Sequence, residues 1–236
     1  RLILCFDNAQ VALSKVLVFI AETWIAINNM IVAMTSQTHW KLSGMDNLDR
    51  DQWYLVTCNH QSWADILVLQ RISNRRVPFL KFFLKQELIK VPVLGLAWWG
   101  LDFPFMKRYT KAYLAKHPEK AGQDLATTRK ACEKFKSKPV SIMNFVEGTR
   151  FTVAKHQRQQ SPFTHLLKPK AGGIAFVLSA MGEQLHKLID VTIDYPGGVP
   201  SYWDFVCGKV KEIRVNVAVT PIKEIIEGGF FNDTYF

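Results

Sequence analysis

The chain has 236 residues, of which 48% are hydrophobic and 21% charged. This length suits one domain with a full core, and the composition excludes a disordered, collagen-like or low-complexity protein. The formal net charge is +10. Residues 66–170 hold 21 basic and 6 acidic side chains, whereas the rest of the chain holds 9 and 14. The positive charge therefore belongs to one region, which could face anionic lipid, nucleic acid or a phosphorylated substrate.

The amino-terminal segment, residues 11–35, is mostly apolar, but polar residues recur in it about every seven positions. On a helix this period gathers them into one narrow stripe and leaves a broad apolar arc that includes Trp24. The longest unbroken apolar run, residues 16–21, is far shorter than the ~20 residues that cross a bilayer, so a spanning helix is disfavoured. Two interpretations stay open: a helix that lies on or partly within a membrane, and a core or dimer-packing helix.

After a polar linker at residues 44–50, the chain alternates between strand and helix patterns. Strands are expected at residues 53–58, 141–146, 188–193 and 213–219, helices after residue 62 and at 121–136 and 173–181, and a short strand and helix within 78–89. This alternation predicts an α/β domain, residues 41–236, with a largely parallel sheet flanked by helices. A membrane-associated helical segment, residues 1–40, is expected to precede it.

The four cysteines give no sign of a metal site or a disulfide framework. Cys5, Cys58, Cys132 and Cys207 are far apart, without a C-x-x-C pair or a His-rich neighbourhood. We therefore expect no bound metal.

The first segment that could carry chemistry is NHQSWAD, residues 59–65, where a strand pattern gives way to a helix. His60 lies at the expected strand end and Asp65 in the opening turn of the helix. A carboxylate in this position could accept a hydrogen bond from the imidazole, fix its tautomer and leave the other nitrogen as a general base. The alternative is a structural histidine beside a helix that is capped by Ser62.

The second segment is Glu147-Gly148-Thr149-Arg150, directly after the expected strand at residues 141–146. Ligand groups commonly follow the strands of α/β sheets. Gly148 permits a sharp turn, and the paired donors of Arg150 suit a phosphate. The alternative is a salt bridge between Glu147 and Arg150 at the strand end.

The third segment, Phe105-Met106-Lys107-Arg108, ends an aromatic stretch that includes Trp99. Its abrupt change from apolar to basic residues suggests phosphate capture beside a surface compatible with lipid. The alternative is a solvated run of charges.

In this order, the three segments resemble the 1-acylglycerol-3-phosphate acyltransferase family, the lysophosphatidic acid acyltransferases, and the resemblance covers most of the chain. Residues 59–65 read as the family's NH-x4-D block, 105–108 as the F-x-x-R end of its second block and 147–150 as its EGTR block. Residues 83–88, 169–170 and 191–196 (VTIDYP) look like further family segments. The second block is longer than the usual pattern, which leaves Phe105 and Arg108 aligned but not Gly100. The sequences of these segments most resemble a bacterial membrane branch that is similar to eukaryotic lysocardiolipin and lysophosphatidylinositol acyltransferases.

The resemblance implies transfer of a fatty acyl group from an acyl thioester to the free hydroxyl of a lysophospholipid, with 1-acylglycerol-3-phosphate giving phosphatidic acid. It implies that His60 is the general base and that Asp65 orients it. The implied acceptor site consists of Arg108, Glu147, Gly148, Thr149 and Arg150, with Lys107 and Lys85 as weaker phosphate ligands. Glu147 is expected to orient Arg150 or a glycerol hydroxyl. Cys58, two residues before His60, is an alternative nucleophile, but nothing nearby marks it as an activated thiolate.

The same resemblance implies acyl-CoA or acyl-carrier protein as the acyl donor and no bound cofactor. The expected partners are the two lipid substrates, a membrane bilayer and, for one donor, acyl-carrier protein. The expected location is the bacterial inner membrane, with the catalytic domain facing the cytoplasm. Two competing interpretations stay open, another lysophospholipid acceptor and an anionic-lipid-binding module without turnover; a third competitor is a nucleic-acid-binding protein. The last is not expected, because the chain has no RNP aromatic motif and no zinc-finger spacing.

Overall fold

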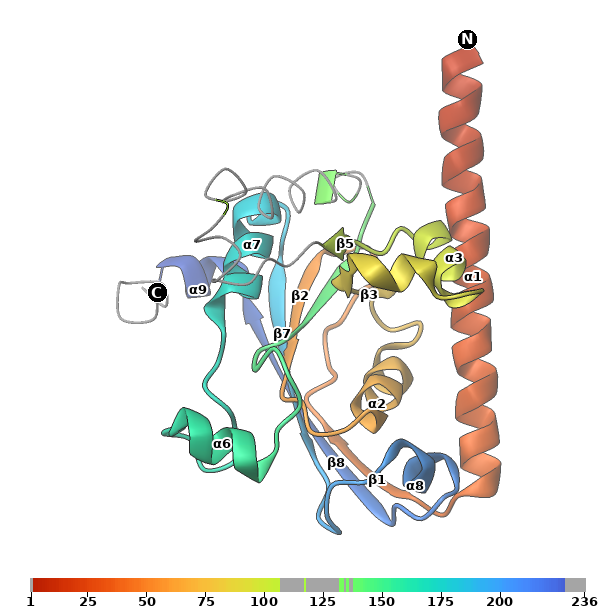
Figure 1. Ribbon diagram of the computed structural model, residues 1–236. Coiled ribbons are helices and arrows are strands. Elements are labelled where there is room, and N and C mark those ends of the chain that lie inside the picture. Colours follow the sequence, from red (N-terminus) through yellow and green to blue (C-terminus); the bar gives the residue numbers. More distant parts are fainter. Residues whose placement is uncertain (1, 107–116, 118–131, 134, 136–137, 228–236) are drawn as a thin grey trace.

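Figure 1 shows the computed structural model of the protein, which describes residues 2–106, 117, 132–133, 135 and 138–227. The described strands form a six-stranded sheet in the order β1-β8-β7-β2-β6-β3. They are β1 (His39–Ser43), β2 (Tyr54–Cys58), β3 (Leu80–Phe82), β6 (Ser141–Phe145), β7 (Lys187–Asp194) and β8 (Glu212–Pro221). Every neighbouring pair is parallel except β7 and β8, which are antiparallel. The expected α/β domain with a largely parallel sheet is confirmed.

Helices lie against both faces of this sheet (Figure 1). The described ones are α1 (Leu2–Thr35), α2 (Ala64–Ser73), the 3-10 helix η1 (Gln86–Lys90), α3 (Leu94–Gly100), α6 (Val153–Gln159), α7 (Ala171–Met181), α8 (Tyr202–Val206) and α9 (Ile222–Glu227). A separate pair of short parallel strands, β4 (Leu84–Lys85) and β5 (Phe105–Met106), lies near α3.

The burial of each strand follows from its position in the sheet. The five residues of β2, YLVTC, are all buried, as expected for a central strand that is covered on both faces. In β7 and β8 buried and exposed residues alternate, because one face of each strand is open to solvent. The central strands β2 and β6 therefore contain the best-buried residues of the sheet.

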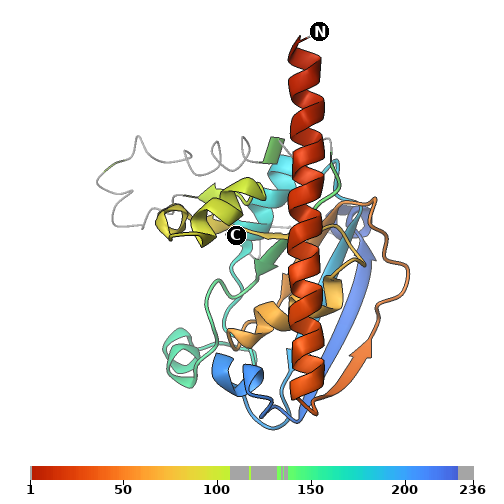
Figure 2. The same cartoon turned by 90° about the vertical axis from the view of Figure 1, so that its right-hand side faces the viewer.

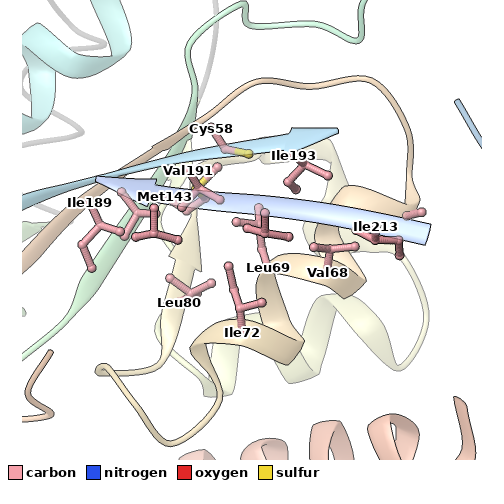
Figure 3. Packing of buried hydrophobic residues seen from close by; sticks show 14 of the residues in the cluster. Cys58, Val68, Leu69, Ile72, Leu80, Met143, Ile189, Val191, Ile193 and Ile213 are labelled. Carbon is pink, nitrogen blue, oxygen red and sulfur yellow. The ribbon is translucent and has the colours of Figure 1, made fainter. Parts of the chain in front are cut away.

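The core is divided between the two faces of the sheet. On one face Val68, Leu69 and Ile72 of α2 point toward strand residues such as Ile193 (Figure 3). Their spacing of one, three and four positions puts them on a single side of the helix. On the other face α7 packs against β2 and β6 through residues that include Val177. Packing on both faces fixes α2 relative to the end of β2, where the NHQSWAD segment lies.

Most of the expected elements are present. The strands expected at 53–58, 141–146, 188–193 and 213–219 are β2, β6, β7 and β8, and the helix expected at 173–181 is α7. Residues 78–89 contain β3, β4 and most of a 3-10 helix rather than one strand and one helix. The helix expected at 121–136 lies outside the described residues apart from 132–133 and 135. The expected domain boundary between residues 40 and 41 falls inside β1, which pairs with β8.

The polar stripe of α1 faces the rest of the protein. Glu22 is buried and accepts a hydrogen bond from the guanidinium of Arg50, and its main-chain carbonyl accepts one from the side chain of Asn74. Arg75 of the turn after α2 donates to the hydroxyl of Thr23. The stripe expected from the seven-residue spacing therefore exists, and α2 and the turn that follows it occupy it.

The apolar arc of α1 is exposed, and it includes Phe19, Trp24 and Met34. Residues Val11–Thr35 form a helix that is long and apolar enough to cross a membrane by length and composition. The short unbroken apolar run therefore does not exclude a spanning helix, because the polar residues are too few to lower the mean hydropathy of the whole segment. Figures 1 and 2 show that α1 runs along one side of the domain and extends beyond it at the amino terminus.

Candidate active site

Two of the three sequence segments meet at the carboxyl ends of neighbouring parallel strands. The segment that contains His60 follows β2, and the segment that begins at Glu147 follows β6, which pairs with β2 in parallel. The main-chain N–H of Phe151 donates to the carbonyl of His60 at 2.7 Å, which joins the two segments directly. This edge of an α/β sheet is the usual location of ligand groups.

His60 and Asp65 form a hydrogen-bonded pair. The distance between His60 Nδ1 and Asp65 Oδ2 is 2.9 Å, and the side chains are 12% and 1% exposed. A carboxylate accepts, so Nδ1 carries the proton, and in the neutral ring Nε2 then carries the lone pair. The ring stacks on Phe145 of β6, with centroids 3.8 Å apart. Among the described residues Nε2 has no hydrogen-bond partner, so this nitrogen is available as a base.

Asp65 also organises the turn that leads into α2. Its Oδ2 accepts from the main-chain N–H groups of Gln61 and Ser62 at 2.7 and 2.8 Å. The helix begins at Ala64 and its formal cap position is Trp63, whose side chain makes no capping bond, but the Ser62 hydroxyl accepts from the main-chain N–H of Ala64 at 3.1 Å, so Ser62 does satisfy a donor at the helix start. The same hydroxyl donates to the carbonyl of Pro200. The aspartate thus shapes the turn that presents His60.

Glu147 has a different environment from the expected one. It is fully buried, and its two carboxylate oxygens accept from the main-chain N–H groups of His60 and Leu167 at 2.8 and 2.9 Å. Within the described residues it forms no ion pair with Arg150. The alternative of a salt bridge between Glu147 and Arg150 and the expected orientation of Arg150 by Glu147 are both wrong, because the Glu147 side chain is buried whereas Arg150 is exposed and lies over Trp63. Glu147 joins the end of β2 to the segment before α7.

Gly148, Thr149 and Arg150 lie on the exposed side of this buried carboxylate. Gly148 adopts a φ of +65°, a conformation that favours glycine, and an added Cβ would lie 3.0 Å from Cδ of Lys170. The Arg150 side chain is exposed, and its guanidinium lies 5.0 Å from the ring centroid of Trp63. This cation–π contact holds Arg150 beside the NHQSWAD segment. The structure therefore brings three of the expected acceptor residues to the His60–Asp65 pair.

Two lysines near this turn were not expected as site residues. The Nζ of Lys155 donates to the Thr149 hydroxyl at 2.8 Å and to the Arg150 carbonyl at 2.9 Å. Lys155 lies in the first turn of α6, where the Thr152 side chain caps the helix. In the sequence, a threonine at the start of a helix pattern was the one sign that a helix begins here and places Lys155 near the turn. Lys170 reaches Gly148, as described above. Arg150, Lys155 and Lys170 thus surround the same short turn with positive charge.

The structure does not bring Lys85 to this group. Lys85 pairs with Met106 across β4 and β5. In both views β5 lies toward α3 and α7, whereas α6 follows the Glu147–Arg150 turn at the other end of the sheet (Figures 1 and 2). Lys107 and Arg108 lie outside the described residues.

Cys58 is part of the core. Its side chain is buried, and burial, followed by the negative charges of Asp65, Asp190 and Glu147, raises the pKa of its thiol well above the usual value. A thiol in these surroundings stays protonated and is a poor nucleophile. The structure supports the interpretation of Cys58 as a core residue.

The described part of the chain contains no group of three or more His, Cys, Asp or Glu side chains arranged to hold a metal ion. The groups available for chemistry at the site are the imidazole of His60, which Asp65 orients, and the nearby cations Arg150, Lys155 and Lys170. This combination can remove a proton from a hydroxyl group while holding an anionic group close by.

Comparisons with known proteins identify the family to which the chain is similar. Residues 39–196 match a family model described as Acyltransferase. A curated relative, probable 1-acyl-sn-glycerol-3-phosphate acyltransferase 5 of Arabidopsis thaliana, is 24% identical over 224 residues, or 89% of this chain and 56% of the relative. Another, 1-acyl-sn-glycerol-3-phosphate acyltransferase gamma of Mus musculus, is 26% identical over 184 residues, or 72% of this chain and 46% of the relative. The chain spans about half the length of these relatives.

Among solved structures, the 1-acyl-sn-glycerophosphate (LPA) acyltransferase PlsC from Thermotoga maritima is similar, with a TM-score of 0.51 and 18% sequence identity. The similarity covers 97% of this chain and 73% of that one. At this identity it establishes the shared fold. The expected bacterial branch is not tested by these comparisons and stays a prediction.

Proposed function

The chain belongs to the Acyltransferase family, and on that basis we propose that it transfers a fatty acyl group from an acyl thioester to the free hydroxyl of a lysophospholipid. The acceptor is 1-acylglycerol-3-phosphate, and the product is phosphatidic acid. The observation that carries the proposal is the 2.9 Å bond between His60 and Asp65 at the carboxyl end of β2.

In this reaction His60 Nε2 takes the proton of the acceptor hydroxyl as its oxygen attacks the thioester carbonyl. Asp65 holds the ring through Nδ1 and stabilises the imidazolium that forms. The C–S bond then breaks, and the leaving thiolate takes the proton from the imidazolium. The acyl group moves directly to the acceptor without an acyl-enzyme.

The acceptor phosphate binds at the turn that follows Glu147. Arg150 offers paired donors, and Lys155 uses two of its three N–H groups within the turn, which leaves one for a ligand. Lys170 adds a third cation beside Gly148. Arg108 and Lys107 are proposed to complete the site on the strength of the family resemblance. The acyl donor is acyl-CoA or acyl-carrier protein, which parallel assays with the two thioesters distinguish.

We further propose that the protein lies on a membrane through α1 and α3. The exposed arc of α1 is continued by α3 and the residue before it, where Val93 is 81% and Leu96 70% exposed. The two helices lie beside one another in both views (Figures 1 and 2). Because Arg50 and Arg75 bind the polar stripe of α1, a spanning arrangement would carry these cations toward the hydrocarbon. An α1 that lies in the interface avoids that cost.

From the family resemblance we place the membrane as the bacterial inner membrane, with the α/β domain in the cytoplasm. Fluorescence of a protease-sensitive tag fused to the carboxyl terminus, measured in spheroplasts with and without protease, tests this orientation.

The decisive experiment is an acyl-transfer assay of the purified protein with a panel of lysophospholipids. His60→Ala should lower turnover at least ~100-fold, since a general base contributes about that much. Asp65→Asn should also be severely impaired, because an amide can hold the wrong tautomer of the ring. Near-normal turnover by folded His60→Ala protein would refute the mechanism. Lipid binding by the wild-type protein without transfer to any acceptor would favour a lipid-binding module instead.

A further inference from the structure

The carboxylate of Asp65 has a partner that the reaction described above does not use. The hydroxyl of Tyr195 donates to Asp65 Oδ1 at 2.7 Å, whereas His60 and two main-chain N–H groups occupy Oδ2. Tyr195 is 5% exposed, and Asp65 is also buried. Without the tyrosine hydroxyl, Oδ1 would have no partner among the described residues.

Tyr195 is held in this position by the residues on either side of His60. The Asn59 side chain makes two hydrogen bonds with the main chain of Ile193. Its amide nitrogen donates to the carbonyl at 2.9 Å, and its amide oxygen accepts from the N–H at 2.8 Å. Gln61 donates to the same carbonyl at 2.9 Å. The end of β7 is therefore fixed to the segment that carries His60. Two residues after Ile193, Tyr195 donates to Asp65, so the end of β7 is bonded both to the residues beside His60 and to the aspartate that orients its ring.

The surroundings keep the tyrosine as a hydrogen-bond donor. Burial, followed by the charge and the hydrogen bond of Asp65, raises the pKa of Tyr195 far above its usual value. The phenol therefore stays protonated over the whole range in which the enzyme works. A donor on Oδ1 draws negative charge toward that oxygen and away from Oδ2, which faces the imidazole.

We propose that Tyr195 is a positioning residue for the acyl-transfer reaction: its hydroxyl fixes the plane of the Asp65 carboxylate and moderates the negative charge that Asp65 presents to His60. The inference rests on the proposed function, since it assigns His60 as the base. No residue of the NH-x4-D or EGTR segments supplies this bond, and the tyrosine lies 130 positions after Asp65.

Several charged or titratable groups surround His60. Asp65 bonds the ring, Glu147 bonds the main-chain N–H, Cys58 and Asp190 lie on β2 and β7, and Arg150 is exposed over Trp63. Tyr195→Phe changes none of these residues. It leaves more charge on Oδ2, and this favours the imidazolium form of His60. We therefore expect the acid limb of the kcat/KM profile to move to higher pH by about 0.5–1 unit.

The loss of orientation should also lower kcat at the pH optimum about three- to tenfold. The KM values for donor and acceptor should change little, because the tyrosine is buried beneath Asp65. Tyr54→Phe is the matched control. Tyr54 is equally buried, but its hydroxyl accepts from the N–H of Asp49 and donates to Gln52. This control should lose a similar amount of thermal stability without any movement of the acid limb.

A second variant covers the case in which Tyr195→Phe does not fold. Replacement of Tyr195 by 3-fluorotyrosine makes the phenol a stronger donor at almost the same size, so the acid limb should move to lower pH. Titration of the His60 ring resonances by NMR, assigned by comparison with His60→Ala, measures the same effect without turnover. Movement in opposite directions for the two Tyr195 variants supports the inference.

An acid limb and an NMR titration that both stay at the wild-type pH in the Tyr195 variants would overturn the inference, even if stability falls as it does in Tyr54→Phe. Failure of the proposed function has a different signature. In that case the wild-type protein transfers no acyl group, while the NMR titration still responds to Tyr195.

Discussion

Replacement of Glu147 by Gln tests whether this residue braces the site or binds the acceptor. The carboxylate is fully buried and accepts one main-chain N–H on each oxygen. In the Glu147→Gln variant one of these N–H groups, from His60 or Leu167, faces the amide hydrogens of the introduced side chain instead of an oxygen. The variant thus loses one charge-assisted hydrogen bond and leaves a buried donor unpaired.

The magnitude follows from these contacts. A hydrogen bond to a charged group contributes about 1.5–3 kcal/mol, and an unpaired buried donor costs about 1–3 kcal/mol. A neutral amide is easier to bury than a carboxylate, which offsets part of the loss. We expect the free energy of unfolding to fall by about 2–4 kcal/mol, and for a chain of this length the Tm to fall by roughly 5–15 °C.

The assay is thermal unfolding followed by circular dichroism, together with turnover below the unfolding temperature. Turnover should fall because the main chain of His60 loses its support, with kcat affected more than the acceptor KM. Glu183→Gln is the control, because Glu183 is exposed and the change should leave the Tm within about 1 °C. A Glu147→Gln protein with wild-type Tm and a raised acceptor KM would refute the bracing role and restore the role in acceptor binding.

Three further predictions concern other parts of the molecule. Arg150→Ala should raise the KM for the phosphorylated acceptor at least ~10-fold and leave the donor KM unchanged. Arg150→Lys should restore the acceptor KM only in part. Equal effects on both KM values would contradict the role of Arg150 in phosphate binding. Cys58→Ala should retain turnover within about threefold. In the native protein Cys58 should resist alkylation at pH 8 in a mass-spectrometric assay, because its raised pKa keeps the thiolate scarce. Loss of turnover in a folded Cys58→Ala variant would support the cysteine mechanism instead. Leu96→Glu should reduce flotation with anionic vesicles at least ~5-fold without changing the circular dichroism spectrum. The control is Val153→Glu on α6, a similarly exposed position, which should leave flotation unchanged. Unchanged flotation by both variants would exclude α3 from the membrane surface.

Local patterns in the sequence were enough for the central part of the fold. Residues 54–58 and 141–145 were recognisable as strands because each is a short, largely apolar segment of the kind that occupies the buried centre of a parallel sheet. The spacing of His60 and Asp65 made a hydrogen bond between them possible, because a strand end and the first turn of the next helix are adjacent along the chain, and the structure contains this bond. The polar stripe of α1 was predictable for the same reason, since helical periodicity is a local property.

Other elements carried no such local signal. The edge strand β1, His39–Ser43, is largely exposed, and its alternation is limited to Trp40 and Leu42, so its pairing with β8 depends on a partner 173 positions away. The helix α6 has no buried residue, and its cap was the only indication of its start. Such elements are stabilised by pairing and capping rather than by a periodic apolar face.

The roles of the buried polar residues depended most on tertiary contacts. The sequence placed Glu147 next to Arg150, but the fold brings the main chain of His60 and Leu167 to its carboxylate. It likewise brings Tyr195 to Asp65 across 130 positions. A buried carboxylate must satisfy both oxygens, and the donors that do so come from whichever segments the packing brings within reach. Residue type and spacing therefore determined which groups could do the chemistry, and the assembly of the strand ends determined which groups hold them in place.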